Sequence, residues 1–156
     1  MIDAINKIFT IYRITNQING KIFNDYDFGG FLIWFHPEQK IFGDGRLEIY
    51  QGQPIKDYII AARAYKGWEQ ILDKYEIDTI FIRPTLSLNE PMINSRNWEL
   101  VYYDDSSVIY LRKGTFPNIP RLKSITPYFN RNKDIDFNIS EYNYLLKENS
   151  NYANGY

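Results

Sequence analysis

The sequence predicts an α/β fold: a single three-layer, Rossmann-like domain with a mainly parallel sheet that ends in an antiparallel edge hairpin. Three observations support this prediction. Short apolar runs alternate with stretches of helical periodicity. The run from Asp78 to Ile82 is β-rich and almost continuously apolar, which is typical of a parallel strand covered on both faces. Two further β-rich runs flank a four-residue polar turn, as in a hairpin.

The individual elements follow from apolar spacing and from the residues that interrupt it. The predicted elements are a strand at 21–23, a helix at 28–35, a strand at 40–42, an extended piece around 47–50, an amphipathic helix at 56–75, a strand at 78–82, a short helix within 86–94, and hairpin strands at 98–103 and 108–112. Asp25 or Asp27 can cap the first helix, and Pro37 ends it. Gly67 can divide the long helix in two.

The chain divides into three parts. Residues 1–19 have roughly helical apolar spacing with charged interruptions, which predicts an N-terminal helical segment too polar for a signal peptide. Residues 20–113 form the α/β domain. Residues 114–156 are rich in Asn, Lys and Pro, which predicts a peripheral, partly disordered tail. Nowhere do eighteen apolar residues run together, so we expect no transmembrane segment.

Composition and charge argue against several classes of function. The formal net charge is -1, so nucleic acid is not an expected partner. The absence of Cys excludes disulfides, thiolate metal sites and a cysteine nucleophile. His36 is the one His of the sequence, which argues against a His-based metal site or a Ser-His-Asp triad and favours a helix-end role. We expect no metal, no cofactor and no catalytic residue.

Polar side chains follow three predicted parallel strands, at the edge where open α/β sheets place their ligand crevice. The expected contact residues there are Asn24, Asp27, Asp44, Arg46 and Arg83. All of them except Asn24 also have a simpler interpretation: an acidic residue at a helix start is more often a cap, and Arg83 suits a solvated strand end equally well. Asp44 and Arg46 fit an ion pair between strand ends as well as a recognition pair for a polar ligand.

Glycines and aromatic residues also have competing interpretations. Gly29-Gly30 lacks the GxGxxG spacing and a P-loop Lys, so we expect a close contact between helix and strand rather than a phosphate site. Trp34, Trp68 and Trp98 can stack on sugar rings, but their apolar neighbours favour core positions. Asp104-Asp105 precedes two serines, which indicates turn chemistry rather than a cation site.

Four motifs, in this order and spacing, resemble a recurring soluble domain over about residues 20–113. The motifs are FNDYDFGGFLIW, KIFGDGR, W-x-x-IL-x-KY-x-ID-x-I-x-I and W-x-LVYYDDSSVIYLRK. Together they resemble the C-terminal extracytoplasmic domain of multi-spanning bacterial and archaeal membrane proteins related to dolichyl-phosphate-mannose-type, or type C, glycosyltransferases. Gly43 departs from the pattern, because the group usually carries a bulkier apolar residue there. The membrane helices that precede the domain in that group are not in the given sequence.

The resemblance implies a non-catalytic accessory or recognition domain of a glycosyltransferase-like membrane protein. Such a domain contacts a glycan, a partner or the membrane-embedded part, on the extracytoplasmic face of the membrane. The residues alone leave two alternatives open. One is a small standalone enzyme or binding protein for a nucleotide or sugar-phosphate at the same crevice, which suits the cytoplasm. The other is a structural interaction module, favoured by the abundant Tyr and Trp.

Overall fold

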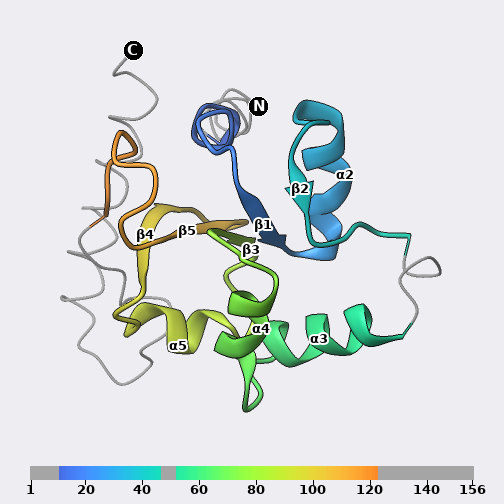
Figure 1. Cartoon of the computed structure of the whole chain (residues 1–156). Helices are drawn as coiled ribbons and strands as arrows, with labels where there is room; N and C mark the ends of the chain where they lie inside the picture. The colour runs from blue at the N-terminus through green and yellow to red at the C-terminus, as the bar shows by residue number, and fades with distance from the viewer. Residues whose placement is uncertain (1–10, 47–51, 123–156) are drawn as a thin grey trace.

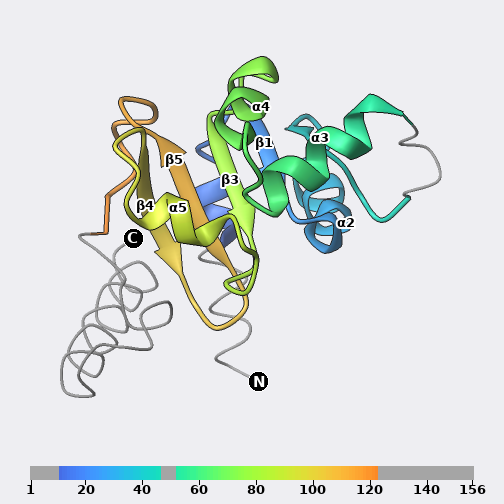
Figure 2. The same cartoon turned by 90° about the horizontal axis from the view of Figure 1, so that it is seen from below.

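A computed structural model of the chain describes residues 11–46 and 52–122. These residues form a mixed α/β unit with one five-stranded sheet and helices on both of its faces (Figures 1 and 2). The extended piece expected around 47–50, the first ten residues of the N-terminal segment and most of the expected tail lie outside the described residues. No helix in the described ranges is long and apolar enough to span a membrane.

The sheet is half parallel and half antiparallel. Its strands are β1 (Lys21–Asn24), β2 (Lys40–Ile41), β3 (Thr79–Ile82), β4 (Trp98–Tyr103) and β5 (Val108–Arg112), in the order β2-β1-β3-β5-β4. β1 pairs in parallel with β2 and β3, whereas β5 runs antiparallel to β3 and β4. The prediction of a mainly parallel sheet is therefore only partly correct. The apolar, buried β5 takes the interior position beside β3, and the less buried β4 forms the edge.

The helices agree with the expected order, with one division. They are α2 (Tyr26–Phe35), α3 (Gln53–Ala62), α4 (Trp68–Lys74) and α5 (Asn89–Ile93), preceded by an N-terminal helix described over residues 11–15. The periodic stretch at 56–75 covers most of α3, which begins earlier at Gln53, and all of α4. Gly67 has φ 99°, a left-handed conformation that residues with a Cβ rarely adopt, and α4 starts directly after it. The prediction that Gly67 divides the long helix is confirmed.

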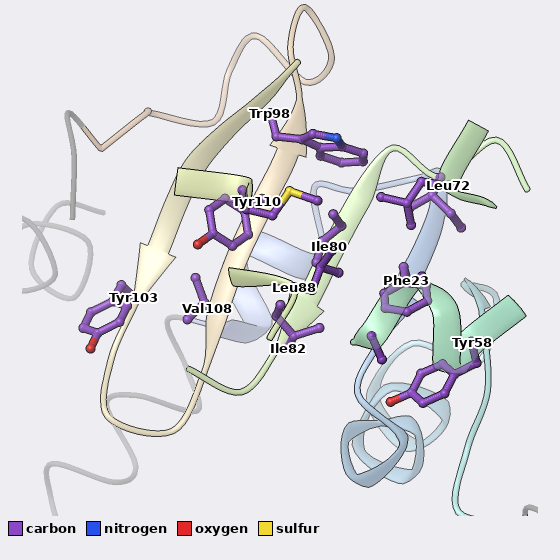
Figure 3. Close-up of a cluster of buried hydrophobic side chains, with 14 of the residues drawn as sticks. Phe23, Tyr58, Leu72, Ile80, Ile82, Leu88, Trp98, Tyr103, Val108 and Tyr110 are labelled. Carbon is purple, nitrogen blue, oxygen red and sulfur yellow. The ribbon is translucent and has the colours of Figure 1, made fainter. Parts of the chain in front are cut away.

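Two apolar clusters, one on each face of the sheet, hold these helices. Alternation along β3 sends Ile80 and Ile82 into the first cluster, with α3, α4 and α5 (Figure 3), and Phe81 into the second. The second cluster contains residues of α2 and of the N-terminal helix, such as Leu32 and Ile14. The helices on each face of the sheet are therefore held by a separate apolar cluster.

The three tryptophans differ in burial. Trp98 is buried in the first cluster and Trp68 packs against it half-buried, as the core interpretation expects. Trp34, in contrast, is 82% exposed, so the core prediction is wrong for this residue. Helix α2 is apolar on nearly all sides, so its sequence carries no periodic signal for the side that faces solvent.

The turn between β4 and β5 is organised by one carboxylate. Asp104 accepts hydrogen bonds from the backbone N–H groups of Ser106 (2.8 Å) and Ser107 (2.7 Å), and from the hydroxyl of Tyr102 (2.7 Å). The interpretation of Asp104 as a turn residue is confirmed.

The buried side chain of Asp57 links α3 to the end of α4. Its buried carboxylate accepts hydrogen bonds from Lys74 Nζ (2.6 Å), the Tyr75 hydroxyl (2.8 Å) and Gln53 Nε2 (2.7 Å). Burial raises the pKa of Asp57, but the hydrogen bonds from Lys74, Gln53 and Tyr75 together outweigh it and hold this pKa below its ordinary value. Asp57 therefore stabilises the fold above its ordinary pKa, and this stabilisation is lost as the pH falls below it.

We expect Asp57→Ala to lower the free energy of unfolding by about 1–3 kcal/mol, because the half-buried Tyr75 hydroxyl loses its acceptor. Asp73→Ala is the matched control. It removes an ion pair with Arg112 in which the Asp73 side chain is 64% exposed, so its cost is expected to be at most about 1 kcal/mol. Urea unfolding at neutral pH measures both, and equal losses for the two variants would contradict a structural role for Asp57.

Candidate functional site

The candidate site lies at the carboxyl ends of β1, β2 and β3, where α2 begins. The side chain of Asp25, directly after β1, accepts the backbone N–H of Asp27 at 3.2 Å and caps the helix. The expectation that Asp25 or Asp27 caps α2 is confirmed, and Asp25 is the cap. The backbone N–H of Asp25 also donates to Phe81 O at 2.9 Å, which ties the helix start to β3.

A second contact of Asp25 links it to the end of β3. Arg83, the first residue after β3, donates from Nη2 to Asp25 Oδ1 at 2.7 Å and from Nε to the other carboxylate oxygen. Nη2 also donates to Asp27. The hydrogen bonds to Asp25 and Asp27 outweigh desolvation and raise the pKa of Arg83 above its ordinary value. The guanidinium is therefore a permanently charged group held at a fixed position.

The three side chains of this cluster differ in their exposure to solvent. The Asp25 side chain is 3% exposed, Arg83 is 41% exposed and Asp27 is 72% exposed. The buried carboxylate thus anchors the cation from inside, while Arg83 and Asp27 present a donor and an acceptor to solvent. A ligand that reaches this edge meets both groups together.

The side chain of Asn24 is buried beneath the same edge of the sheet. It is fully buried, and its Nδ2 donates to Gly43 O at 2.7 Å while its Oδ1 accepts from Phe42 N at 3.0 Å. These bonds join the end of β1 to the loop after β2. Asn24 therefore positions that loop rather than reaching the surface.

Asp44 and Arg46 form a second carboxylate–guanidinium pair in the loop after β2. Arg46 donates from Nε to Asp44 Oδ1 at 2.9 Å and from Nη2 to Oδ2 at 2.6 Å, and its backbone N–H also donates to Oδ1 at 2.9 Å. The Asp44 side chain is 5% exposed, whereas that of Arg46 is 65% exposed. The ion pair that the sequence suggested is present, but it joins two residues of one loop rather than two strand ends. Its carboxylate is again buried beneath an exposed guanidinium.

Gly29 allows α2 to approach this loop closely. A Cβ at Gly29 would lie 2.5 Å from both Asp44 Cα and Gly43 O. The expected close contact of the glycine pair is confirmed at Gly29, and its partner is the loop after β2. A Cβ at Gly43 would in turn lie 2.7 Å from Cε1 of Tyr26, which explains why a bulkier residue does not fit at that position here.

The structure brings the five expected residues together in three groups. Asp27 contacts Arg83, Asp44 contacts Arg46, and Asn24 binds the loop that carries the second pair. The start of α2 touches both pairs: the cap residue Asp25 and Asp27 bind Arg83, and Gly29 lies against Asp44.

Sequence reasoning missed two residues that shape the site. It favoured a cap role for Asp25 and left it out of the expected contact residues, although this residue anchors Arg83 across 58 positions of the chain. It also missed Asn89, whose buried amide donates to Arg83 O at 2.9 Å and fixes the turn after β3. The position of Asp25 directly after a strand parallel to β3 was the one sequence feature that could have predicted its contact with Arg83. No sequence feature indicated the role of Asn89.

Two other features of the described residues lie outside this edge. A hollow of about 330 Å³ at the amino ends of the parallel strands is lined by Asn19, Gly20, Lys21, Glu38, Lys40, Glu76 and Asp78. Within residues 11–46 and 52–122, no three His, Asp or Glu side chains are grouped to hold a metal ion.

Comparisons with known proteins leave the site to be interpreted from its geometry. No family model, no curated protein and no solved structure matches this chain.

The two glycines of α2 provide a matched test of the contact with the loop after β2. Gly29→Ala is expected to destabilise the domain by about 1–3 kcal/mol, because the added Cβ meets the backbone of that loop. Gly30→Ala meets nothing within 4 Å, and it should stabilise the helix by about 0.5–1 kcal/mol. Thermal unfolding of both variants measures the difference. If Gly29→Ala were as stable as Gly30→Ala, the close approach would be wrong.

Proposed function

We propose that this domain is a non-catalytic recognition domain of a glycosyltransferase-like membrane protein, and that its carboxyl edge binds a neutral glycan. The observation that carries the proposal is the exposed Asp27–Arg83 pair, anchored by the buried Asp25. A sugar hydroxyl both donates and accepts hydrogen bonds. Neighbouring hydroxyls on one ring therefore match a carboxylate acceptor beside a guanidinium donor.

Preorganisation supports recognition at this edge. Both exposed guanidinium groups, of Arg83 and Arg46, are held in bidentate contacts by buried carboxylates. A planar donor held in place loses less conformational entropy when it binds than a mobile one does. The buried carboxylates Asp25 and Asp44 orient these donors, which suits a contact surface better than proton transfer.

Charge at the edge favours a neutral ligand over the nucleotide or sugar-phosphate of the alternative reading. The Asp27–Arg83 pair, the Asp44–Arg46 pair and Asp25 together contain three carboxylates and two guanidinium groups, whose charges sum to one negative charge. Each guanidinium is already paired with a carboxylate, which opposes the binding of a further anion such as phosphate. A polyhydroxylated neutral ring meets no such opposition.

The topology is consistent with this location. Strand order β2-β1-β3, with α2 on one face and α3 and α4 on the other, supports a Rossmann-like arrangement in this half of the sheet. In such sheets the crevice opens between the strands from which the connections diverge, here β1 and β3. Arg83 and Asp25 lie at that position. The sequence resemblance supports the assignment to a membrane glycosyltransferase-like protein, in which transfer chemistry lies elsewhere.

A structural interaction module is the second candidate. It is favoured by the exposure of three consecutive apolar side chains at the end of α2, Ile33 (42%), Trp34 (82%) and Phe35 (42%). Surface aromatics of this kind are enriched at protein interfaces.

Titration of the isotope-labelled domain with neutral hexose oligosaccharides, inorganic phosphate and a nucleoside diphosphate separates these readings. We expect only the neutral oligosaccharides to shift resonances around Asp27 and Arg83. Asp27→Ala removes the exposed acceptor and should weaken binding by about tenfold or more, which corresponds to about 1.4 kcal/mol. Asp105→Ala, at the exposed hairpin turn, is the control and should leave binding unchanged.

Two outcomes would contradict the proposal. Tighter binding of phosphate or nucleotide than of saccharide at this edge would favour the alternative reading. If Asp27→Ala and Asp105→Ala bound the saccharide with equal affinity, the Asp27–Arg83 pair would have no role in recognition.

A further inference from the structure

His36 lies where the N-terminal helix meets the end of α2. Its backbone N–H donates to Leu32 O and caps α2, which confirms the helix-end role expected from the sequence. Its ring is 1% exposed, stacks on Tyr12 with 5.2 Å between centroids, and places Nε2 2.7 Å from Thr15 Oγ1. We call Tyr12, Thr15 and His36 the His36 junction. It is a polar contact of the N-terminal helix with α2, in the midst of apolar packing.

The hydrogen bonds of Thr15 favour one tautomer of the neutral ring. Thr15 Oγ1 lies 2.9 Å from Ile11 O, so its single proton is donated to a carbonyl of its own helix. In that arrangement the hydroxyl accepts a hydrogen bond from the Nε2–H of His36. Nδ1 is left unprotonated, 3.8 Å from Glu38 Oε1. Acid therefore adds its proton at Nδ1 and creates a charge inside the junction.

The groups around His36 do little to stabilise a positive charge on its ring. Besides His36, the charged or titratable groups in the described segments 11–20 and 36–42 are Tyr12, Arg13, Glu38 and Lys40. Burial lowers the pKa of His36, and attraction to Glu38, whose side chain is 69% exposed, raises it by less. Because the folded-state pKa is depressed, the junction contributes its full stability above about pH 6.5 and loses it as the pH falls.

We propose that the His36 junction makes the attachment of the N-terminal helix acid-labile, so that protonation of His36 favours local opening of residues 11–18 over opening of the sheet. The apolar contacts of Ile11, Ile14 and Ile18 keep the helix docked in most molecules. Acid raises the population of the open state. Opening uncovers Leu32 beside the exposed Ile33, Trp34 and Phe35, and so enlarges the apolar surface on this side of α2.

Amide hydrogen exchange between pH 7.5 and pH 5, expressed as protection factors, tests this inference. In the unmodified domain, protection of the amides in 14–18 should fall by about threefold or more relative to the amides of β3. His36→Gln keeps a side-chain donor for Thr15 without titrating, so its relative protection should not change with pH. Glu38→Gln removes the compensating carboxylate and should enlarge the acid effect.

An independent measurement needs no variant. His36 is the only His of the sequence, so the ring resonances of the unmodified domain report its titration without overlap. A midpoint clearly below the ordinary histidine value is expected. A midpoint at or above that value, or an acid effect of equal size in His36→Gln, would overturn the inference.

Discussion

The buried carboxylate of Asp25 is the constraint on which the arrangement of this domain depends. A carboxylate removed from water requires hydrogen bonds and a counter-ion, and here the α2 backbone and Arg83 provide them. One side chain therefore fixes where α2 starts and where the chain goes after β3. The tight packing of Gly29 against Asp44 then places the loop after β2. The exposed groups of the edge owe their positions to these contacts.

Helix α2 connects the two surfaces to which we assign roles. Its first turn holds the Asp27–Arg83 pair at the carboxyl edge, and its last turn leads to His36 and to the exposed Trp34. The ten residues of α2 thus carry a polar surface at one end and an apolar surface at the other. The two proposals rest on different ends of the helix and different chemistry, so each stands or fails without the other.

The sequence predicts the elements of this fold better than their arrangement. Strands β1 and β3 are predictable because their apolar runs are short and bounded by polar residues, and the carboxyl-edge argument correctly gathered Asp27 with Arg83. The anchoring of Arg83 by Asp25 was not predictable, because it joins residues 58 positions apart and no local pattern encodes it. The interior position of β5 depends on which strand of the hairpin buries more surface. The exposure of Trp34 was not predictable, because α2 is apolar on nearly all sides and its sequence does not mark the side that faces solvent.

A double-mutant cycle on Asp25 and Arg83 tests the central claim most directly. The free energy of unfolding would be measured in urea for the unmodified domain, Asp25→Ala, Arg83→Ala and the double variant. Because the cycle cancels the loss of the helix cap, it isolates the interaction between the two side chains. The account predicts a coupling energy of about 1–3 kcal/mol, discounted for the partial exposure of Arg83. A coupling energy below about 0.5 kcal/mol would mean that the two residues act independently, and would contradict the account.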